Sequence, residues 1–331
     1  MAEIVLGVGT SHSPMLSTPP EQWDLRTKAD RENRHHYYRG RQYDFEELLK
    51  ERAPGFSHEI DLDTKHARQT RCRRAIEALG RKLKEVAPDA IIIVGNDQHE
   101  FFNDALIPAV SVYRAKQIEN IPFTGPEPSP GIGIAEPGNC PPEGATYPGC
   151  PEMADHLIRS LIDEGFDVTQ LSSAAGSGPR RGIPHAFGFI YHSILDDVVP
   201  PSVPVFFNDF FPPNRPTVRR CLALGHAIGQ AIKNWDGVKR VALIASGGLS
   251  HFVIDEELDR TVLSSIVRRN EDALARLSEN FFQSGTSEIK NWLAVAAAMN
   301  DAGRAFNLID YVPCYRSEAG TGNAMCFGFW E

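Results

Sequence analysis

Three short runs of residues are apolar at almost every position, and they constrain the fold more than any other feature of the sequence. They lie at 3–9 (EIVLGVG), 88–95 (PDAIIIVG) and 240–248 (RVALIASGG). A strand with one face in water alternates apolar and polar residues, whereas a run that is apolar throughout is typical of a strand covered on both faces. These runs therefore predict central strands of a sheet with helices on both sides.

Helical patterns separate these runs along the chain. Helices are predicted at 66–87, 151–165, 216–234, 256–278 and 287–302, and two further strands at 203–208 and 307–313. Strands that alternate with helices are typical of α/β proteins with a parallel or mixed sheet. We therefore expect one α/β domain over residues 1–331, with a central, mostly parallel or mixed β-sheet flanked by helices.

Two stretches interrupt this alternation. Residues 19–65 form a polar insertion, in which 26–41 holds six Arg or Lys residues against two acidic ones. Residues 121–151 carry nine prolines and show no periodicity. Long loops of this kind are commonly lids or binding loops. We expect the 121–151 loop to exclude water from a nearby site.

Composition narrows the class of protein. The net charge is −9, which argues against binding to nucleic acid or to an anionic membrane, since both require a basic surface. No apolar run approaches the roughly 18 residues of a membrane-spanning helix. The N-terminal residues lack the pattern of a signal peptide, and the six cysteines form no CxxC pair. We expect a soluble cytoplasmic protein with reduced thiols.

Histidines follow three of the apolar strands. His12 lies in GTSHSP, His99 in GNDQHEFF and His251 in SGGLSHF. Ligands of α/β sheets bind where the carboxyl ends of the strands open, so these three side chains are candidates for one site. His185 starts another apolar run and is a further candidate. The remaining histidines are expected to be structural or exposed, namely His35, His36, His58, His66, His156, His192 and His226.

Gathered imidazoles point to two kinds of chemistry. Neutral imidazole is a metal ligand and, near neutral pH, a general acid or base. Two histidines and a carboxylate suit Fe(II) with O₂, and they also suit hydrolytic zinc. The residue types alone do not decide between Fe(II) with O₂ and hydrolytic zinc. The sequence contains no GxSxG, Walker A, GxGxxG or HExxH pattern, which disfavours serine hydrolases, P-loop proteins and dinucleotide binding.

These motifs resemble the class III extradiol ring-cleavage dioxygenases. The similarity is to the catalytic β subunit of protocatechuate 4,5-dioxygenase and to relatives that act on gallate and 3-O-methylgallate. GVGTSHSPML resembles the segment whose histidine binds iron, which implies His12 as a ligand. APDAIIIVGNDQHEFF resembles the segment of the second ligand, which implies His99, although Gln98 separates Asp97 from that histidine. Asn96 and Asp97 are expected to orient a ligand.

The same resemblance implies three further site residues. SEIKNWLAVAAAMNDAG places the carboxylate ligand at Glu288, four residues before Trp292. ASGGLSHF implies His251 as the acid–base residue, and IPHAFGFIY implies His185 as the residue that bonds the substrate. The C-terminal GTGNAMCFGFW is similar to the end of methylgallate-type members.

The resemblance implies an Fe(II) dioxygenase that opens the ring of a carboxylated, lignin-derived catechol with O₂. Failure of the five residues to converge in space would instead favour a non-catalytic binding protein. The resemblance also implies a homodimer. Alternatives stay open: a larger biphenyl-type catechol, a zinc hydrolase, a non-catalytic binding protein of the same fold, Mn(II) in place of Fe(II), and a separate small subunit. The basic stretch 26–41 either binds the substrate carboxylate or is a solvated surface.

Overall fold

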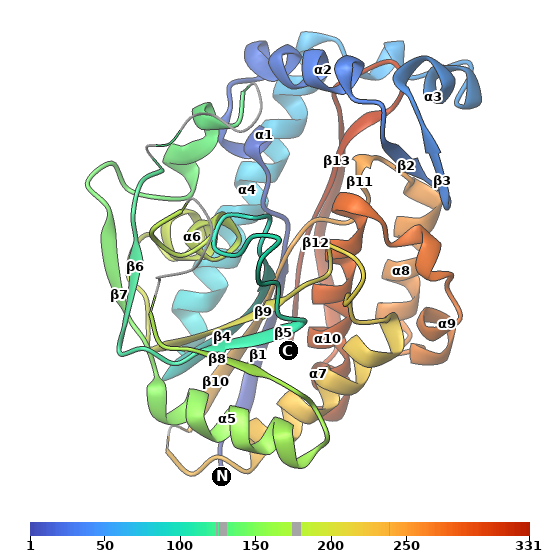
Figure 1. Ribbon diagram of the computed structural model, residues 1–331. Helices are drawn as coiled ribbons and strands as arrows, with labels where there is room; N and C mark the ends of the chain where they lie inside the picture. The colour runs from blue at the N-terminus through green and yellow to red at the C-terminus, as the bar shows by residue number, and fades with distance from the viewer. Residues whose placement is uncertain (124, 126–130, 174–179, 238) are drawn as a thin grey trace.

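A computed structural model describes residues 1–123, 125, 131–173, 180–237 and 239–331. These residues form one α/β domain around a mixed sheet of nine strands, in the order β11-β13-β1-β10-β4-β9-β5-β8 with β12 beside β13 (Figure 1). The fold class expected from the sequence is confirmed. The strands of this sheet are β1 (Glu3–Thr10), β4 (Ala90–Asn96), β5 (Val110–Tyr113), β8 (Thr169–Leu171), β9 (Ser202–Phe207), β10 (Arg240–Ser246), β11 (His251–Val253), β12 (Phe306–Tyr315) and β13 (Thr321–Trp330).

The centre of the sheet is parallel. Strands β1, β10, β4 and β9 run side by side in one direction, and every residue of β4 is buried. Parallel neighbours end at the same edge of a sheet, so the carboxyl ends of β1, β10 and β4 lie together. Strand β13 runs antiparallel to β1 and was not expected from the sequence, because its glycines and small residues give no clear strand pattern.

Helices cover both faces of the sheet, and each face has its own hydrophobic core. One core packs beneath α4 and α6, the other beneath α5, α7, α8 and α10 (Figure 1). The α-helices are α1 (Pro14–Ser17), α2 (Trp23–Glu32), α3 (Phe45–Glu51), α4 (Leu62–Val86), α5 (Pro151–Asp163), α6 (His185–Phe189), α7 (Val218–Lys233), α8 (Glu256–Val267), α9 (Glu271–Ala275) and α10 (Ile289–Asp301). The shorter helical segments are η1 (Pro20–Gln22), η2 (Ser57–Glu59), η3 (Gly133–Gly138), η4 (Ile190–Ile194), η5 (Glu279–Phe281) and η6 (Ser284–Glu288).

Helix α10 is fixed closely against α7. A side chain at Gly225 of α7 would place its Cβ 2.0 Å from the carbonyl oxygen of Ala294, so only glycine permits this approach. The single helix expected at 256–278 is instead two helices. Arg269 adopts a left-handed conformation with φ 54°, and the Asn270 side chain then accepts a hydrogen bond from Ala273 N and caps α9.

The polar insertion 19–65 contains regular structure. It holds α2, α3 and a two-stranded sheet of β2 (His36–Tyr38) and β3 (Arg41–Tyr43), at the top of Figure 1. The basic stretch inside it is largely engaged: Arg31 pairs with Glu318, and Arg39 Nε lies 2.7 Å from Asp255 Oδ2. These two arginines therefore serve contacts within the chain.

The 121–151 loop also contains a strand. Strand β7 (Ala145–Pro148) pairs with β6 (Gln117–Asn120), so this part of the loop is more regular than its prolines suggest. Positions 124 and 126–130 lie outside the described residues, and the expected lid role therefore stays a prediction. None of the described helices is both long enough and apolar enough to cross a lipid bilayer.

Candidate active site

His12 follows β1 and is oriented by a chain of hydrogen bonds. Its side chain is 3% exposed. Ser246 Oγ, at the end of β10, donates its only hydrogen to the Ala186 carbonyl at 2.5 Å. The same oxygen lies 3.0 Å from His12 Nδ1, so Nδ1 must be the donor in that contact. The His12 Nε2 atom is buried without a hydrogen-bond partner, and in the neutral imidazole it carries a lone pair.

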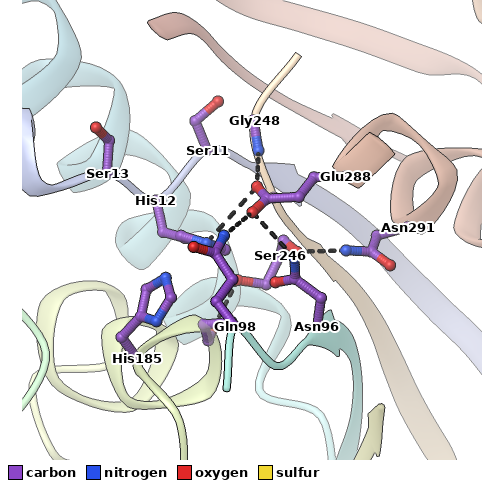
Figure 2. Close-up of polar contacts among 12 residues, drawn as sticks. Ser11, His12, Ser13, Asn96, Gln98, His185, Ser246, Gly248, Glu288 and Asn291 are labelled. Atoms are coloured by element: carbon purple, nitrogen blue, oxygen red, sulfur yellow. Dashed lines mark hydrogen bonds and ion pairs between the residues drawn. The ribbon is translucent and has the colours of Figure 1, made fainter. Parts of the chain in front are cut away.

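Glu288 lies at the end of η6, immediately before α10, and is fully buried. Its Oε1 accepts hydrogen bonds from Asn96 Nδ2 at 3.1 Å and Gln98 Nε2 at 2.8 Å. Its Oε2 accepts one from Gly248 N at 2.9 Å. Figure 2 shows these three donors around the carboxylate. They hold it in one orientation.

The second oxygen of Glu288 faces two imidazoles. Oε2 lies 3.7 Å from His12 Nε2 and 3.4 Å from His251 Nε2. Burial alone would raise the pKa of Glu288, but the nearby His251 and His12 hold it well below its ordinary value. Burial lowers the pKa of His12 more than Glu288 raises it, which favours the neutral ring.

His251 begins β11 and is fixed on both sides. Its Nδ1 donates to the Leu249 carbonyl at 2.7 Å, which directs Nε2 toward Glu288. Thr286 Oγ1 accepts from the His251 backbone N at 3.0 Å and donates to its carbonyl at 2.8 Å. Gly285 must remain glycine, since its Cβ would lie 2.2 Å from His251 Cδ2. Burial would lower the pKa of His251, but Glu288 raises it above its ordinary value.

His185 begins α6 and lies beside His12. The two ring centroids are 4.7 Å apart with the planes at 86°, and Figure 2 shows the rings adjacent. His185 Nδ1 bonds Glu100 Oε1, and Glu100 Oε2 also lies 2.8 Å from Arg180 Nε. Burial would lower the pKa of His185, but Glu100 raises it. His185 and Arg180 together lower the pKa of Glu100 to about 2 against the opposing effect of burial.

His99 does not join this group. Its ring stacks on Phe211, with centroids 3.7 Å apart and planes at 4°. Its Nε2 lies 3.4 Å from Asp104 Oδ1, and its side chain is 33% exposed. The structure thus brings together His12, His185, His251 and Glu288, and in place of His99 it brings Gln98 to the carboxylate.

Several residues of the site were missed or only partly foreseen from the sequence. Asn96 contacts Glu288 as expected, whereas Asp97 instead accepts hydrogen bonds from Phe101 N and Phe102 N at 2.8 and 3.0 Å. Asn96 also donates to Asp209 at 3.1 Å. Burial and then the charge of Glu288 raise the pKa of Asp209 to about 7. Sequence offered no signal for Asp209, which follows β9.

The arrangement fits a divalent metal ion in part. A buried imidazole nitrogen without a partner, facing a buried carboxylate oxygen, is a typical pair of ligands for such an ion. The outward Nδ1–H of His12 is bonded to Ser246, as second nitrogens of metal-binding histidines usually are. Within the described ranges of the chain, however, no three His, Cys, Asp or Glu side chains are placed as a metal-binding group.

Comparison with known proteins gives a consistent result. The sequence pattern of the family described as "Catalytic LigB subunit of aromatic ring-opening dioxygenase" matches residues 53–318, most of the chain. Similar curated proteins include three named 2,3-dihydroxyphenylpropionate/2,3-dihydroxicinnamic acid 1,2-dioxygenase. The protein from Comamonas testosteroni is 30% identical over 179 residues, 54% of this chain and 48% of that protein. The one from Photorhabdus laumondii is 30% identical over 199 residues, 60% and 52% of the two chains.

The third, from Mycobacterium sp. strain MCS, is 36% identical over 101 residues, which are 30% of this chain and 29% of that protein. The chain thus spans about half the length of the first two relatives that it matches. Their names refer to a dihydroxylated phenylpropionate, whereas the resemblance seen in the sequence was to enzymes of protocatechuate and gallate.

Proposed function

Because the chain belongs to the family of the catalytic LigB subunit of aromatic ring-opening dioxygenases, we propose that it opens a catechol ring beside its two hydroxyl groups. In this extradiol cleavage both atoms of O₂ enter the product. The observation that carries the proposal is the buried cluster of His12, Glu288 and His251 at the carboxyl ends of the central strands. His185 lies at its side.

The proposed metal is Fe(II), with His12 and Glu288 as two of its ligands. When bound, Fe(II) supplies positive charge that stabilises a catecholate and an electron source for the reaction of O₂. His99 as the third ligand stays a prediction from the sequence. Its observed position beside Asp104 and Phe211 does not support that role.

His251 is the proposed general base. Its Nδ1 donates to the Leu249 carbonyl, so in the neutral ring Nε2, which faces the cluster, is the nitrogen that accepts the proton of a catechol hydroxyl. The same nitrogen returns the proton when the ring opens. A positioned imidazole contributes roughly 10²–10⁴-fold to such a step.

His185 is proposed to stabilise negative charge that develops on an oxygen of the substrate. The carboxylate of Glu100 faces its Nδ1 and favours the protonated ring, which leaves Nε2–H as a donor. Arg180, 4% exposed, holds Glu100 in place through Oε2. These contacts restrict the His185 ring to one orientation next to His12.

The proposed substrate is a single-ring catechol that carries a carboxylate. Protocatechuate, gallate and 3-O-methylgallate, all related to lignin breakdown, share this chemistry with the dihydroxyphenylpropionate named for the relatives. Arg31 and Arg39 of the basic stretch are paired with acids of the chain, so recognition by these two is not part of the proposal. The homodimer and the cytoplasmic location expected from the sequence stay predictions.

Oxygen uptake tests this function. Protein purified without oxygen and loaded with Fe(II) is offered each of the four catechols, with His251→Ala as the control. We expect one O₂ consumed per ring-opened product with at least one substrate, and loss of uptake in the variant. No uptake with any of them, despite one bound iron per chain, would contradict the proposal.

A further inference from the structure

The turn after β4 presents two neighbouring side chains, and only one of them reaches the site. Gln98 Nε2 lies 2.8 Å from Glu288 Oε1. His99 adopts a left-handed backbone conformation with φ 60°, and its ring lies flat on Phe211. The fold thus separates an amide and an imidazole that are adjacent in sequence.

The surroundings of His99 are narrow, and its buried Nε2 has no hydrogen-bond partner. The cavity that it lines, together with Asp97, Phe211 and other residues, has a volume of about 10 Å³, about the space of one water molecule. The acidic neighbour of its Nε2 is Asp104, whose side chain is 93% exposed. One exposed carboxylate beside a stacked ring does not provide enough ligands for a metal site.

We propose that Gln98, and not His99, is the residue that this turn contributes to the metal centre, where its amide orients the Glu288 carboxylate. The inference rests on the proposed function, since it concerns the same Fe(II) site. Gln98 is then a positioning residue, and His12 and Glu288 provide the ligands of this chain that the structure brings together.

The hydrogen bonds of Glu288 explain how Gln98 acts. Asn96 and Gln98 both donate to Oε1. The hydrogen bonds of this oxygen are therefore made to side-chain amides. The Gly248 N–H holds Oε2, which remains directed at His12 Nε2 at 3.7 Å. Without Gln98 the carboxylate loses the shortest of these three hydrogen bonds and is held only by Asn96 and Gly248. Removing a group that orients a metal ligand typically lowers metal affinity ~10–100-fold.

The position of Gln98 also predicts that one substitution increases the affinity for Fe(II). Two imidazoles and one carboxylate are a favoured ligand set for Fe(II). A histidine at position 98 would face the carboxylate from the place that the sequence analysis gave to His99. The added imidazole should outweigh the lost amide, so Gln98→His should bind Fe(II) more tightly than the unaltered protein, a gain that requires position 98 to lie beside the metal.

The test is the Fe(II) dissociation constant, measured without oxygen by competition with a chromogenic chelator. The proteins are the unaltered chain, Gln98→Ala, Gln98→His and the matched neighbour His99→Ala, each checked for folding by circular dichroism. We expect His99→Ala to bind as the unaltered chain does, Gln98→Ala to bind ~10–100-fold more weakly, and Gln98→His to bind more tightly.

Each contrary result has a separate meaning. Loss of affinity in His99→Ala, unchanged affinity in Gln98→Ala, or no gain in Gln98→His would overturn this inference and leave the proposed dioxygenase standing. Failure of the unaltered, folded chain to bind Fe(II) would overturn both this inference and the proposed metal. Because the readout is binding, neither outcome depends on finding the correct catechol.

Discussion

Two clusters of this molecule place an imidazole beside a carboxylate, and they differ in what the ring nitrogens contact. In the surface cluster, His226 Nδ1 lies 2.8 Å from Asp301 Oδ2 and its Nε2 lies 2.8 Å from Glu271 Oε2. Its side chain is 38% exposed. In the buried cluster, His12 has one nitrogen bonded to Ser246 and the other without a hydrogen-bond partner.

The comparison shows how His226 and His12 differ, although a buried nitrogen without a partner also occurs in His36 and His99 and therefore does not by itself mark a ligand. His226 joins α7, α9 and α10 through contacts that satisfy both of its nitrogens, so nothing further is required of it. A buried polar atom without a partner costs free energy, and His12 Nε2 carries that cost beside the charged Glu288. We infer that such a cost persists because a bound group removes it.

The largest expected effect comes from Glu288→Gln, which removes the charge of the buried cluster. Because a ligand is lost, Fe(II) affinity should fall by ~100-fold or more, and oxygen uptake should cease. Metal analysis after dialysis measures the first effect. The matched control is Glu271→Gln in the surface cluster, which should change neither. Equal effects of the two substitutions would remove the distinction between the clusters.

His251→Ala should separate catalysis from metal binding. With the general base gone, kcat should fall ~10²–10⁴-fold, while bound iron per chain stays the same. His226→Ala is the control and should retain full kcat. Steady-state kinetics and metal content, measured on the same samples, decide this prediction. A parallel loss of iron in His251→Ala would identify this residue as a ligand instead.

Glu100→Gln should have an intermediate effect. The substitution keeps the shape of the side chain but removes the charge that faces His185 and Arg180. His185 then loses the partner that fixes its ring, and we expect kcat/KM to fall by about tenfold, with iron content unchanged. Kinetics with the best substrate measure this. Unaltered kcat/KM would show that His185 needs no such support.

The smallest effect is expected at His226. Burial would lower its pKa, but hydrogen bonds to Asp301 and Glu271 raise it above the ordinary value. A raised pKa in the folded state stabilises the fold fully at pH values below the unfolded pKa, and this contribution is lost as the pH rises through the folded pKa. His226→Ala should therefore cost below about 1 kcal/mol at pH 6, because the pair is exposed, and less at pH 9.

Urea unfolding of both proteins at pH 6 and pH 9 measures that difference. A cost that is equal at the two pH values would show that packing of the ring, and not its charge, stabilises the helices. The substitution His226→Ala should leave Fe(II) binding unchanged, since His226 is absent from the buried cluster.

The sequence allowed the frame of the site to be predicted, because the apolar runs at 3–9, 88–95 and 240–248 are the three adjacent parallel strands whose ends form it. The placement of His12 and His251 at those ends follows from that topology. Glu288 required the resemblance to a family, since nothing in the local pattern distinguishes it from nearby acids.

The remaining parts of the site depend on details that periodicity does not carry. The choice between Gln98 and His99 is made by the backbone at one position of a turn, where φ becomes positive. The contact of Arg180 with Glu100 joins residues that are far apart in the chain. Asp209 belongs to the site only because β9 lies next to β4.

The most direct test of the central claim is mass spectrometry of the product formed under ¹⁸O₂. Fe(II)-loaded protein is allowed to turn over the best of the four catechols, and the product is trapped before it exchanges oxygen with water. The account predicts that the ring-opened product carries two ¹⁸O atoms, and that Glu288→Gln yields none of it. A product with one labelled oxygen or none, or one formed equally by Glu288→Gln, would contradict ring opening by a dioxygenase at this cluster.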